Sequence, residues 1–146
     1  MELRRATIDD ADILLSLRND DETRQASFSQ DVVSRDEHLA WLAERLAPMH
    51  AESVWMIDDS DGVVIGTGRI RVINDAFAEI SIVIDPAFRN KGRGRQAIRL
   101  LSETVQLMQR TPVAFVRTEN ARSIRAFSAA GFYTKRFTDD RMELWA

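Results

Sequence analysis

Apolar residues recur along this chain at two spacings, and these predict an alternation of helices and strands. Where apolar residues return every three or four positions, one face of a helix becomes apolar. Three helices of this kind are expected, with apolar faces made of Ile13, Leu14 and Leu17 in the first, Leu39, Leu42 and Leu46 in the second, and Ile98, Leu101, Val105 and Met108 in the third.

The ends of the helices carry their own signals. Thr7-Ile8-Asp9-Asp10 and Ser34-Arg35-Asp36-Glu37 each place a carboxylate three residues after a hydroxyl side chain, an arrangement that caps helix N-termini. The third helix should run from about Arg95 to Gln109. A short fourth helix is expected from Ala121 to Ala130, because Gly131 is a typical left-handed terminator.

Runs rich in β-branched and aromatic residues, bounded by turn residues, predict the strands. They are expected at Glu2–Ala6, Ser53–Ile57, Val63–Ile73, Phe77–Ile84, Val113–Thr118, Phe132–Phe137 and Met142–Trp145. The three strands between positions 53 and 84 should form an antiparallel meander. The order β-α-α-β-β-β-α-β-α-β-β predicts an α/β fold in which a mixed sheet carries helices on its faces.

Composition narrows the class of protein. A chain of 146 residues, 45% hydrophobic and 29% charged, suits a single globular domain spanning 1–146. No apolar run reaches about 18 residues, and the N-terminus lacks a signal-peptide core, so we expect a cytoplasmic protein without a membrane partner. A net charge of −3 argues against nucleic acid as the main partner.

Two residue counts limit the chemistry. The chain has no cysteine, which excludes a disulfide framework and a thiol nucleophile. His38 and His50 are its only histidines, too few for a convincing metal cluster. We therefore expect no metal.

The basic segment between the expected three-stranded meander and the third helix is the strongest indication of chemistry in the sequence. Five of the 20 Lys and Arg residues lie within eleven positions, namely Arg89, Lys91, Arg93, Arg95 and Arg99. Gly92 and Gly94 lie among them and let successive N–H groups converge at a helix N-terminus. An anionic ligand such as a phosphate ester is expected there, and a solvated basic turn is the alternative.

Two motifs carry a family resemblance. Arg89-Asn90-Lys91-Gly92-Arg93-Gly94 matches the signature Arg/Gln-x-x-Gly-x-Gly/Ala, and Asn120 is followed seven residues later by Phe127 and then by Gly131-Phe132. With both motifs at this separation, the whole chain resembles the GNAT family of acyl-CoA-dependent N-acetyltransferases. The resemblance implies a GNAT-like acyl-CoA N-acyltransferase fold, with a mostly antiparallel sheet splayed between its fourth and fifth strands.

The resemblance also implies acetyl-CoA as cosubstrate. Its pyrophosphate would lie on the amides of Arg89, Asn90, Lys91, Gly92, Arg93, Gly94 and Arg95. Its pantetheine arm would run beside Ile82, Val83 and Ile84, with an N–H near Ile84 facing the thioester carbonyl. Asn120 and Phe127 would line the other side of the arm. Core packing for the isoleucines and helix capping for Asn120 are compatible alternatives.

Attack on a thioester requires a neutral amine, so a group in the site must accept a proton from the substrate amine. Many members of the family carry a glutamate at the position of Glu79, where a partly buried carboxylate would serve as general base. The alternative is a strand residue paired with Arg69 or Arg71. His38 is a rival base, although an exposed histidine on an amphipathic helix is also expected.

Protonation of the departing thiolate is less clear from the residues. Many relatives have a tyrosine where this chain has Phe127, and phenylalanine cannot donate a proton. Tyr133 is the only tyrosine of the chain. Tyr133 or water would supply the proton, or the thiolate would leave unassisted, since thiols are acidic enough to be tolerable leaving groups.

The acceptor region resembles the aminosugar branch of the family, in which a nucleotide-linked 4-amino sugar is acetylated. Arg18, Asn19, His38 and Trp41 are the matching residues, and they would bind a nucleotide phosphate and base; the alternative is surface charge together with an aromatic anchor in the core. A protein N-terminus and a polyamine are alternative acceptors, the latter using the carboxylates of Asp20, Asp21 and Glu22. A non-enzymatic module that binds acetyl-CoA or another anion is a third hypothesis, and a homodimer is possible.

Overall fold

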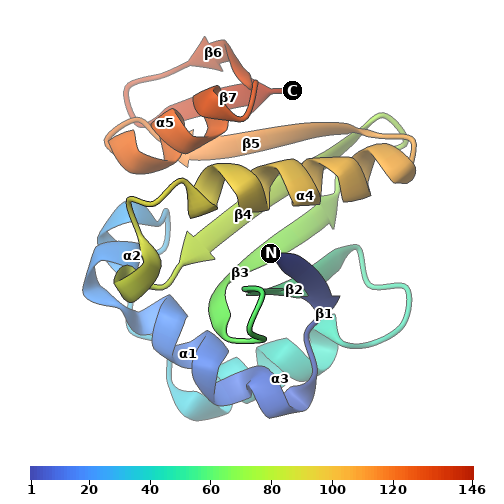
Figure 1. Ribbon diagram of the computed structural model, residues 1–146, viewed down its shortest axis with the longest axis vertical. Coiled ribbons are helices and arrows are strands. Elements are labelled where there is room, and N and C mark those ends of the chain that lie inside the picture. Colours follow the sequence, from blue (N-terminus) through green and yellow to red (C-terminus); the bar gives the residue numbers. More distant parts are fainter.

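A computed structural model describes residues 1–146 and shows one mixed sheet with helices on both faces (Figure 1). The seven strands are β1 (Glu2–Arg5), β2 (Glu52–Asp58), β3 (Val64–Val72), β4 (Phe77–Ile84), β5 (Thr111–Arg117), β6 (Tyr133–Phe137) and β7 (Arg141–Trp145). They lie in the order β1-β2-β3-β4-β5-β7-β6, and only β4 and β5 run parallel to each other. The fold expected from the sequence is therefore confirmed.

Five helices connect the strands. They are α1 (Ala11–Asn19), α2 (Asp21–Ala26), α3 (Arg35–Arg45), α4 (Arg93–Leu107) and α5 (Ala121–Ala129), with short 3₁₀ turns at Ile8–Asp10 and Pro86–Phe88. Figure 1 shows α4 lying along β4 and β5, with α5 beside the C-terminal strands. None of the helices is both long and apolar enough to span a membrane.

Each face of the sheet has its own core. On the α4 face, Ile80 of β4 packs with Ile98 and Leu101 of α4, all of them buried. On the opposite face, Met56 of β2 packs with Leu42 of α3. Because strand side chains alternate between faces, β4 contributes its even-numbered residues to the α4 face and its odd-numbered residues to the other.

The parallel ladder between β4 and β5 is short. It contains only Phe77, Ala78 and Glu79 of β4, paired with residues 111–113 of β5. Beyond Glu79 the two strands diverge, although β4 stays paired with β3 as far as Ile84. The sheet is thus splayed at its centre, as the family resemblance implied.

Three details differ from the sequence expectations. The segment Asp21–Ala26 forms α2, whereas only a polar connection was expected, because it lacks an apolar stripe and is stabilised instead by the Asp20 cap on the Thr23 amide. Ile13 is 43% and Met108 40% exposed, so neither belongs to the core face expected for it. The third expected helix, α4, begins at Arg93 rather than Arg95.

Packing of α4 on the sheet should dominate stability. Leu101→Ala should lower the free energy of unfolding by about 2–5 kcal/mol, because it leaves a cavity under a helix that is otherwise fully packed. Leu107→Ala on the same helix is the matched control, since Leu107 is 86% exposed. Urea unfolding at 25 °C measures both, and equal losses would contradict this account of the core.

Candidate functional site

A cavity of about 760 Å³ lies where β4 and β5 diverge. It extends from the loop before α4, across the exposed part of β4, to the segment between α1 and Ser29. Most of the expected site residues line it, namely Arg18, Glu79, Ile82, Val83, Ile84, Arg89, Asn90, Gly92, Arg93, Gly94, Arg95, Asn120 and Phe127. Lys91, Asn19, His38, Trp41 and Tyr133 lie outside its lining.

Alternate residues of β4 turn their backbone groups into this cavity. The N–H of Asp85, directly after β4, donates to the carbonyl of Ile65 in β3 at 2.9 Å. By the antiparallel register, odd-numbered residues of β4 bond to β3, so Ile82 and Ile84 direct their backbone groups toward the diverging β5. An extended ligand could pair there as an added strand would.

The loop before α4 presents a run of free amides. No backbone N–H from Asn90 to Arg95 donates a hydrogen bond, and the first bond of the helix comes from Gln96 to the carbonyl of Gly92 at 3.2 Å. The N–H of Arg89 is different, because it donates to the carbonyl of Pro86 at 3.5 Å. The amide cradle therefore consists of Asn90–Arg95, without the Arg89 amide that the sequence analysis included.

A side chain at Gly94 would not clash with the rest of the fold. A Cβ built there would contact Ala126 Cβ and Ile82 Cδ1 at 3.6 Å, an ordinary van der Waals distance, and the backbone is not left-handed. Gly92, by contrast, has φ = 73°, a conformation that favours glycine. A side chain at Gly94 would extend toward Ala126 and Ile82, which line the cavity beside the amide cradle. Free amides at a helix N-terminus suit an anion such as pyrophosphate.

The side chain of Arg89 fastens the loop rather than facing the cavity. Its Nε donates to the carbonyl of Ile84 at 2.8 Å, and its two Nη atoms reach Glu22 at 2.9 Å and Asp20 at 3.1 Å. Only 8% of the side chain is exposed. Arg89 thus ties the end of β4 to α2, a role that the sequence motif did not indicate.

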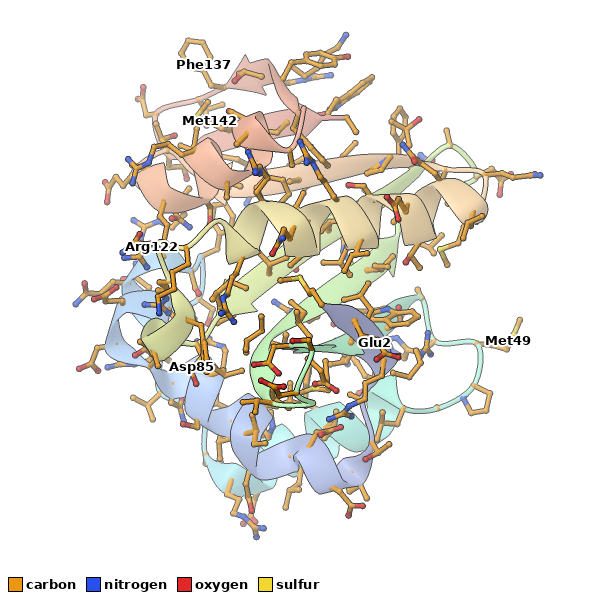
Figure 2. All side chains as sticks on the ribbon, viewed as in Figure 1. Glu2, Met49, Asp85, Arg122, Phe137 and Met142 are labelled. Atoms are coloured by element: carbon orange, nitrogen blue, oxygen red, sulfur yellow. The ribbon has the colours of Figure 1, made fainter.

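Asp20, which caps α2, and Glu22 within α2 both belong to this network. Glu22 also accepts from Arg122 of α5 at 2.9 Å, and Figure 2 shows Arg122 beside the loop that leads into α4. The hydrogen bond from Arg122, aided by the charge of Arg89, lowers the pKa of Glu22. Partial burial works against ionisation of Asp20, but hydrogen bonds from Thr23 and Arg89 outweigh it and lower its pKa.

Glu79 lies in the cavity lining but is paired. Arg71, its cross-strand partner on β3, donates to Glu79 Oε1 through Nε at 2.9 Å and through Nη2 at 2.6 Å. The carboxylate therefore lies against a guanidinium, and not in the apolar surroundings beside Phe77 that would make it a stronger base. This is the alternative that the sequence analysis kept open.

Asn120 and Phe127 line the cavity in structural roles. The Asn120 side chain accepts from the N–H of Ser123 at 3.2 Å and so caps α5. Phe127 is buried and meets Phe132 edge to face, with ring centroids 5.0 Å apart. Both residues border the space where the strands diverge, which is compatible with contact to a ligand.

Tyr133 is far from this chemistry. It opens β6, the outermost strand, and is 51% exposed. Figure 2 shows Phe137, at the other end of the same strand, on the outer rim of the molecule. The expectation that Tyr133 protonates a leaving group is not supported, because β6 is separated from β4 by both β5 and β7.

Three of the expected acceptor residues stabilise the N-terminal helices instead. His38 is buried, and its Nε2 lies 3.0 Å from the carbonyl of Ala11, which makes it a donor there. Asn19 is bonded through both side-chain groups to the backbone of Val33, at 2.9 Å each. Trp41 stacks on His38 with ring centroids 5.7 Å apart. Only Arg18 of the four faces the cavity.

Arg18 is a partly buried guanidinium at the end of the cavity away from the amide cradle. Its Nη2 donates to the carbonyl of Ser29 at 2.9 Å, whereas its Nη1 is buried without a hydrogen-bond partner. Burial, and then the charges of Arg69 and Arg24, lower the pKa of Arg18. The cavity lining as a whole contains eight arginines and two glutamates.

Comparison with known proteins agrees with this architecture. A family model described as "Acetyltransferase (GNAT) domain" matches residues 1–133. No curated protein matches the sequence. Among solved structures, the spermidine N-acetyltransferase from Vibrio cholerae, in complex with CoA and spermine, is 21% identical with a TM-score of 0.87, over 99% of this chain and 94% of that one.

Two further structures have similar folds. A domain from Methanocaldococcus jannaschii is 19% identical with a TM-score of 0.83, over 99% of this chain and 97% of that one. yncA from Salmonella typhimurium, proposed to be an acetyltransferase and solved with its cofactor acetyl-CoA, is 22% identical with a TM-score of 0.78, over 100% of this chain and 92% of that one. These relatives do not support the expected nearness to the aminosugar branch.

The amide cradle can be tested at Gly94. Gly94→Ala should weaken CoA binding about tenfold or more, because the new methyl group occupies the space above the free amides, while the melting temperature should stay near that of the wild type. Arg93→Ala should have the smaller effect on affinity, since the binding groups are backbone amides. Calorimetric titration with CoA measures both, and equal affinity of Gly94→Ala and wild type would rule out this cradle.

The structural role of His38 predicts a pH effect on stability. Burial lowers the pKa of His38 in the folded protein, so the unfolded chain takes up the proton more readily. Stability should therefore fall as the pH drops below about 6.5, the ordinary histidine pKa. His38→Gln should show a smaller loss between pH 7.5 and 5.5 in urea unfolding. An identical loss in both proteins would return His38 to the list of functional candidates.

Proposed function

The chain belongs to the GNAT family of acetyltransferases, and from that premise we propose that it transfers the acetyl group of acetyl-CoA to a primary amine by direct attack in a ternary complex. One observation carries the proposal. The free amides of Asn90–Arg95 adjoin the unpaired edge of β4, so a pyrophosphate and an extended arm can be bound as one continuous ligand. The absence of a side chain at Gly94, beside Ile82 and Ala126 of the lining, supports the same fit.

Ile82 supplies the N–H best placed to stabilise an oxyanion. The pyrophosphate would lie beside Ile84, and the arm then runs back along β4, which rises about 3.3 Å per residue. We therefore place the thioester carbonyl two residues back along β4, opposite Ile82 rather than Ile84, where the sequence analysis placed it. A fixed backbone N–H in a space shielded from water stabilises negative charge that develops on that oxygen.

Glu79 is the carboxylate we propose for proton acceptance. It is one of two carboxylates in the cavity lining, and the other, Glu22, is committed to Arg89 and Arg122. The amine must lose a proton as its nitrogen attacks the carbonyl carbon, and Glu79 can accept it directly or through a water. Arg71 fixes the orientation of the carboxylate.

No side chain is assigned to protonate the departing thiolate. Phe127 has no hydroxyl group, and Tyr133 lies outside the cavity. A thiolate whose conjugate acid has a pKa near 8.5 is a tolerable leaving group, so water can supply the proton after the carbon–sulfur bond breaks. Proximity of the two substrates then supplies a large part of the rate enhancement.

Three classes of acceptor are considered: a nucleotide aminosugar, a protein N-terminus and a small polyamine. The likeness to the Vibrio cholerae spermidine N-acetyltransferase favours the polyamine. At 21% identity, however, that likeness supports a shared fold and not a shared acceptor site. None of the three carboxylates expected to bind a polyamine is unpaired, because Asp20 and Glu22 are bound to Arg89 and Asp21 is bound to Arg24. The charged groups that line the cavity are therefore the best guide to the class of acceptor.

The proposed activity is tested by thiol release from acetyl-CoA with nucleotide aminosugars, N-terminal peptides and polyamines as acceptors. We expect release that depends on both the protein and an amine. A protein that binds acetyl-CoA yet acetylates no amine would support the non-enzymatic alternative. A protein that does not bind acetyl-CoA at all would contradict the proposal.

The role of Glu79 is tested by Glu79→Gln. Turnover near pH 7 should fall about 100-fold, while CoA binding stays nearly unchanged, and higher pH should partly restore the rate by deprotonating the amine without help. Glu143→Gln is the control, because Glu143 is also paired with an arginine in the sheet but lies outside the cavity. An unaltered rate and pH profile in Glu79→Gln would make Glu79 a structural residue only.

A further inference from the structure

The end of the cavity beyond Glu79 has a charge that the transfer reaction itself does not explain. Arg18 comes from α1 and Arg69 from β3, and both line the cavity on the sheet face opposite α4. Their charges act on each other, since Arg69 contributes to the lowered pKa of Arg18. Two neighbouring guanidinium groups destabilise each other unless an anion lies between or beside them.

Arg18 has an unused donor. Burying a guanidinium nitrogen without a partner is costly, yet Arg18 Nη1 has none, while Nη2 is bonded to the carbonyl of Ser29. Asp31 is the one carboxylate whose charge favours the protonated form of Arg18, but the two form no ion pair. Nη1 therefore lacks a partner within the protein, and an anionic group of a ligand that enters the cavity beside Arg18 would supply one.

Arg69 is only partly neutralised. Its Nη1 lies 3.7 Å from Glu52 Oε1, but that oxygen already accepts a hydrogen bond from Arg45 at 3.1 Å. Arg69 remains 43% exposed. It can therefore turn toward a ligand that Arg18 holds.

The carboxylates that line the cavity, and Asp20 beside them, are already paired. Glu79 is bound to Arg71, and Asp20 and Glu22 are bound to Arg89. A polycation entering this end of the cavity would meet two arginines and no uncommitted carboxylate in the lining. An acceptor with an anionic group would instead form charge-assisted hydrogen bonds, which are the strong ones.

We infer that the acceptor amine carries an anionic group, a carboxylate or a phosphate, and that Arg18 and Arg69 bind it while the amine faces β4. This inference rests on the proposed acetyl transfer and names its substrate class. It assigns Arg18 and Arg69 to acceptor specificity, and it separates this chain from the polyamine enzymes that share its fold.

The test compares matched acceptors in the thiol-release assay. Phosphoethanolamine is paired with ethanolamine, β-alanine with propylamine, and spermidine represents a polycation. With wild-type protein, kcat/KM should be about tenfold to a hundredfold higher for the anionic member of a pair, the range expected for hydrogen bonds to a charged group. The pair that shows the larger ratio identifies phosphate or carboxylate as the recognised group.

Variants assign the effect to the two arginines. Arg18→Gln and Arg69→Gln should each reduce the anionic preference about tenfold or more and leave CoA affinity unchanged. Arg35→Gln is the control, since Arg35 is 65% exposed and lies outside the cavity. Arg18→Lys retains the charge and should keep part of the preference, and melting temperatures show whether Arg18→Gln still folds. If Arg18→Gln does not fold, the anionic preference of Arg69→Gln alone tests the inference.

Two results would overturn the inference while leaving acetyl transfer intact. They are a wild-type preference for spermidine or for the neutral amines, and an anionic preference that survives both glutamine variants. If no amine is acetylated, the proposed function fails, and calorimetry with phosphoethanolamine and the CoA-loaded protein tests the anion site alone. Binding that is lost in Arg18→Gln would support the site, and absence of binding would overturn it.

Discussion

The divergence of β4 from β5 is the constraint on which the rest of the site depends. After three paired residues the strands separate, although both remain bonded on their outer sides, β4 to β3 and β5 to β7. Backbone groups within a sheet normally satisfy one another. Here Ile82 keeps both of its backbone groups available and Ile84 keeps its N–H, and the loop and first residues of α4 add six more free amides next to the same gap.

The gap stays open because its borders are held from both sides. Ile98 and Leu101 of α4 pack on the α4 face of β3 and β4, and Gly68 permits this approach, since a Cβ there would lie 2.6 Å from Leu101 Cδ1. On the other side, Arg89 joins the end of β4 to α2, and Arg122 joins α5 to the same glutamate, Glu22. The first residue of the glycine motif thus shapes the loop, while the amides after it are left for a ligand.

Local patterns in the sequence were sufficient for most strands, for the long amphipathic helices and for the loop before α4. They failed where a contact joins distant positions. Arg89 reaches carboxylates 67 and 69 residues earlier in the chain, and no local pattern reveals that pairing. The helix α2 has no apolar stripe, so its six residues read as a connection. The hydroxyl of Tyr133 suggests a proton donor, but no local pattern reveals that its strand, β6, lies at the outer edge of the sheet.

The central claim is that one ligand, acetyl-CoA, lies along the cradle and the open edge of β4. Amide chemical shifts of the ¹⁵N-labelled protein during titration with CoA measure this most directly. The account predicts the largest shifts at Asn90–Arg95, Ile82 and Ile84, with small shifts along β6 and β7. Large shifts confined to other surfaces, or none at the cradle, would contradict it.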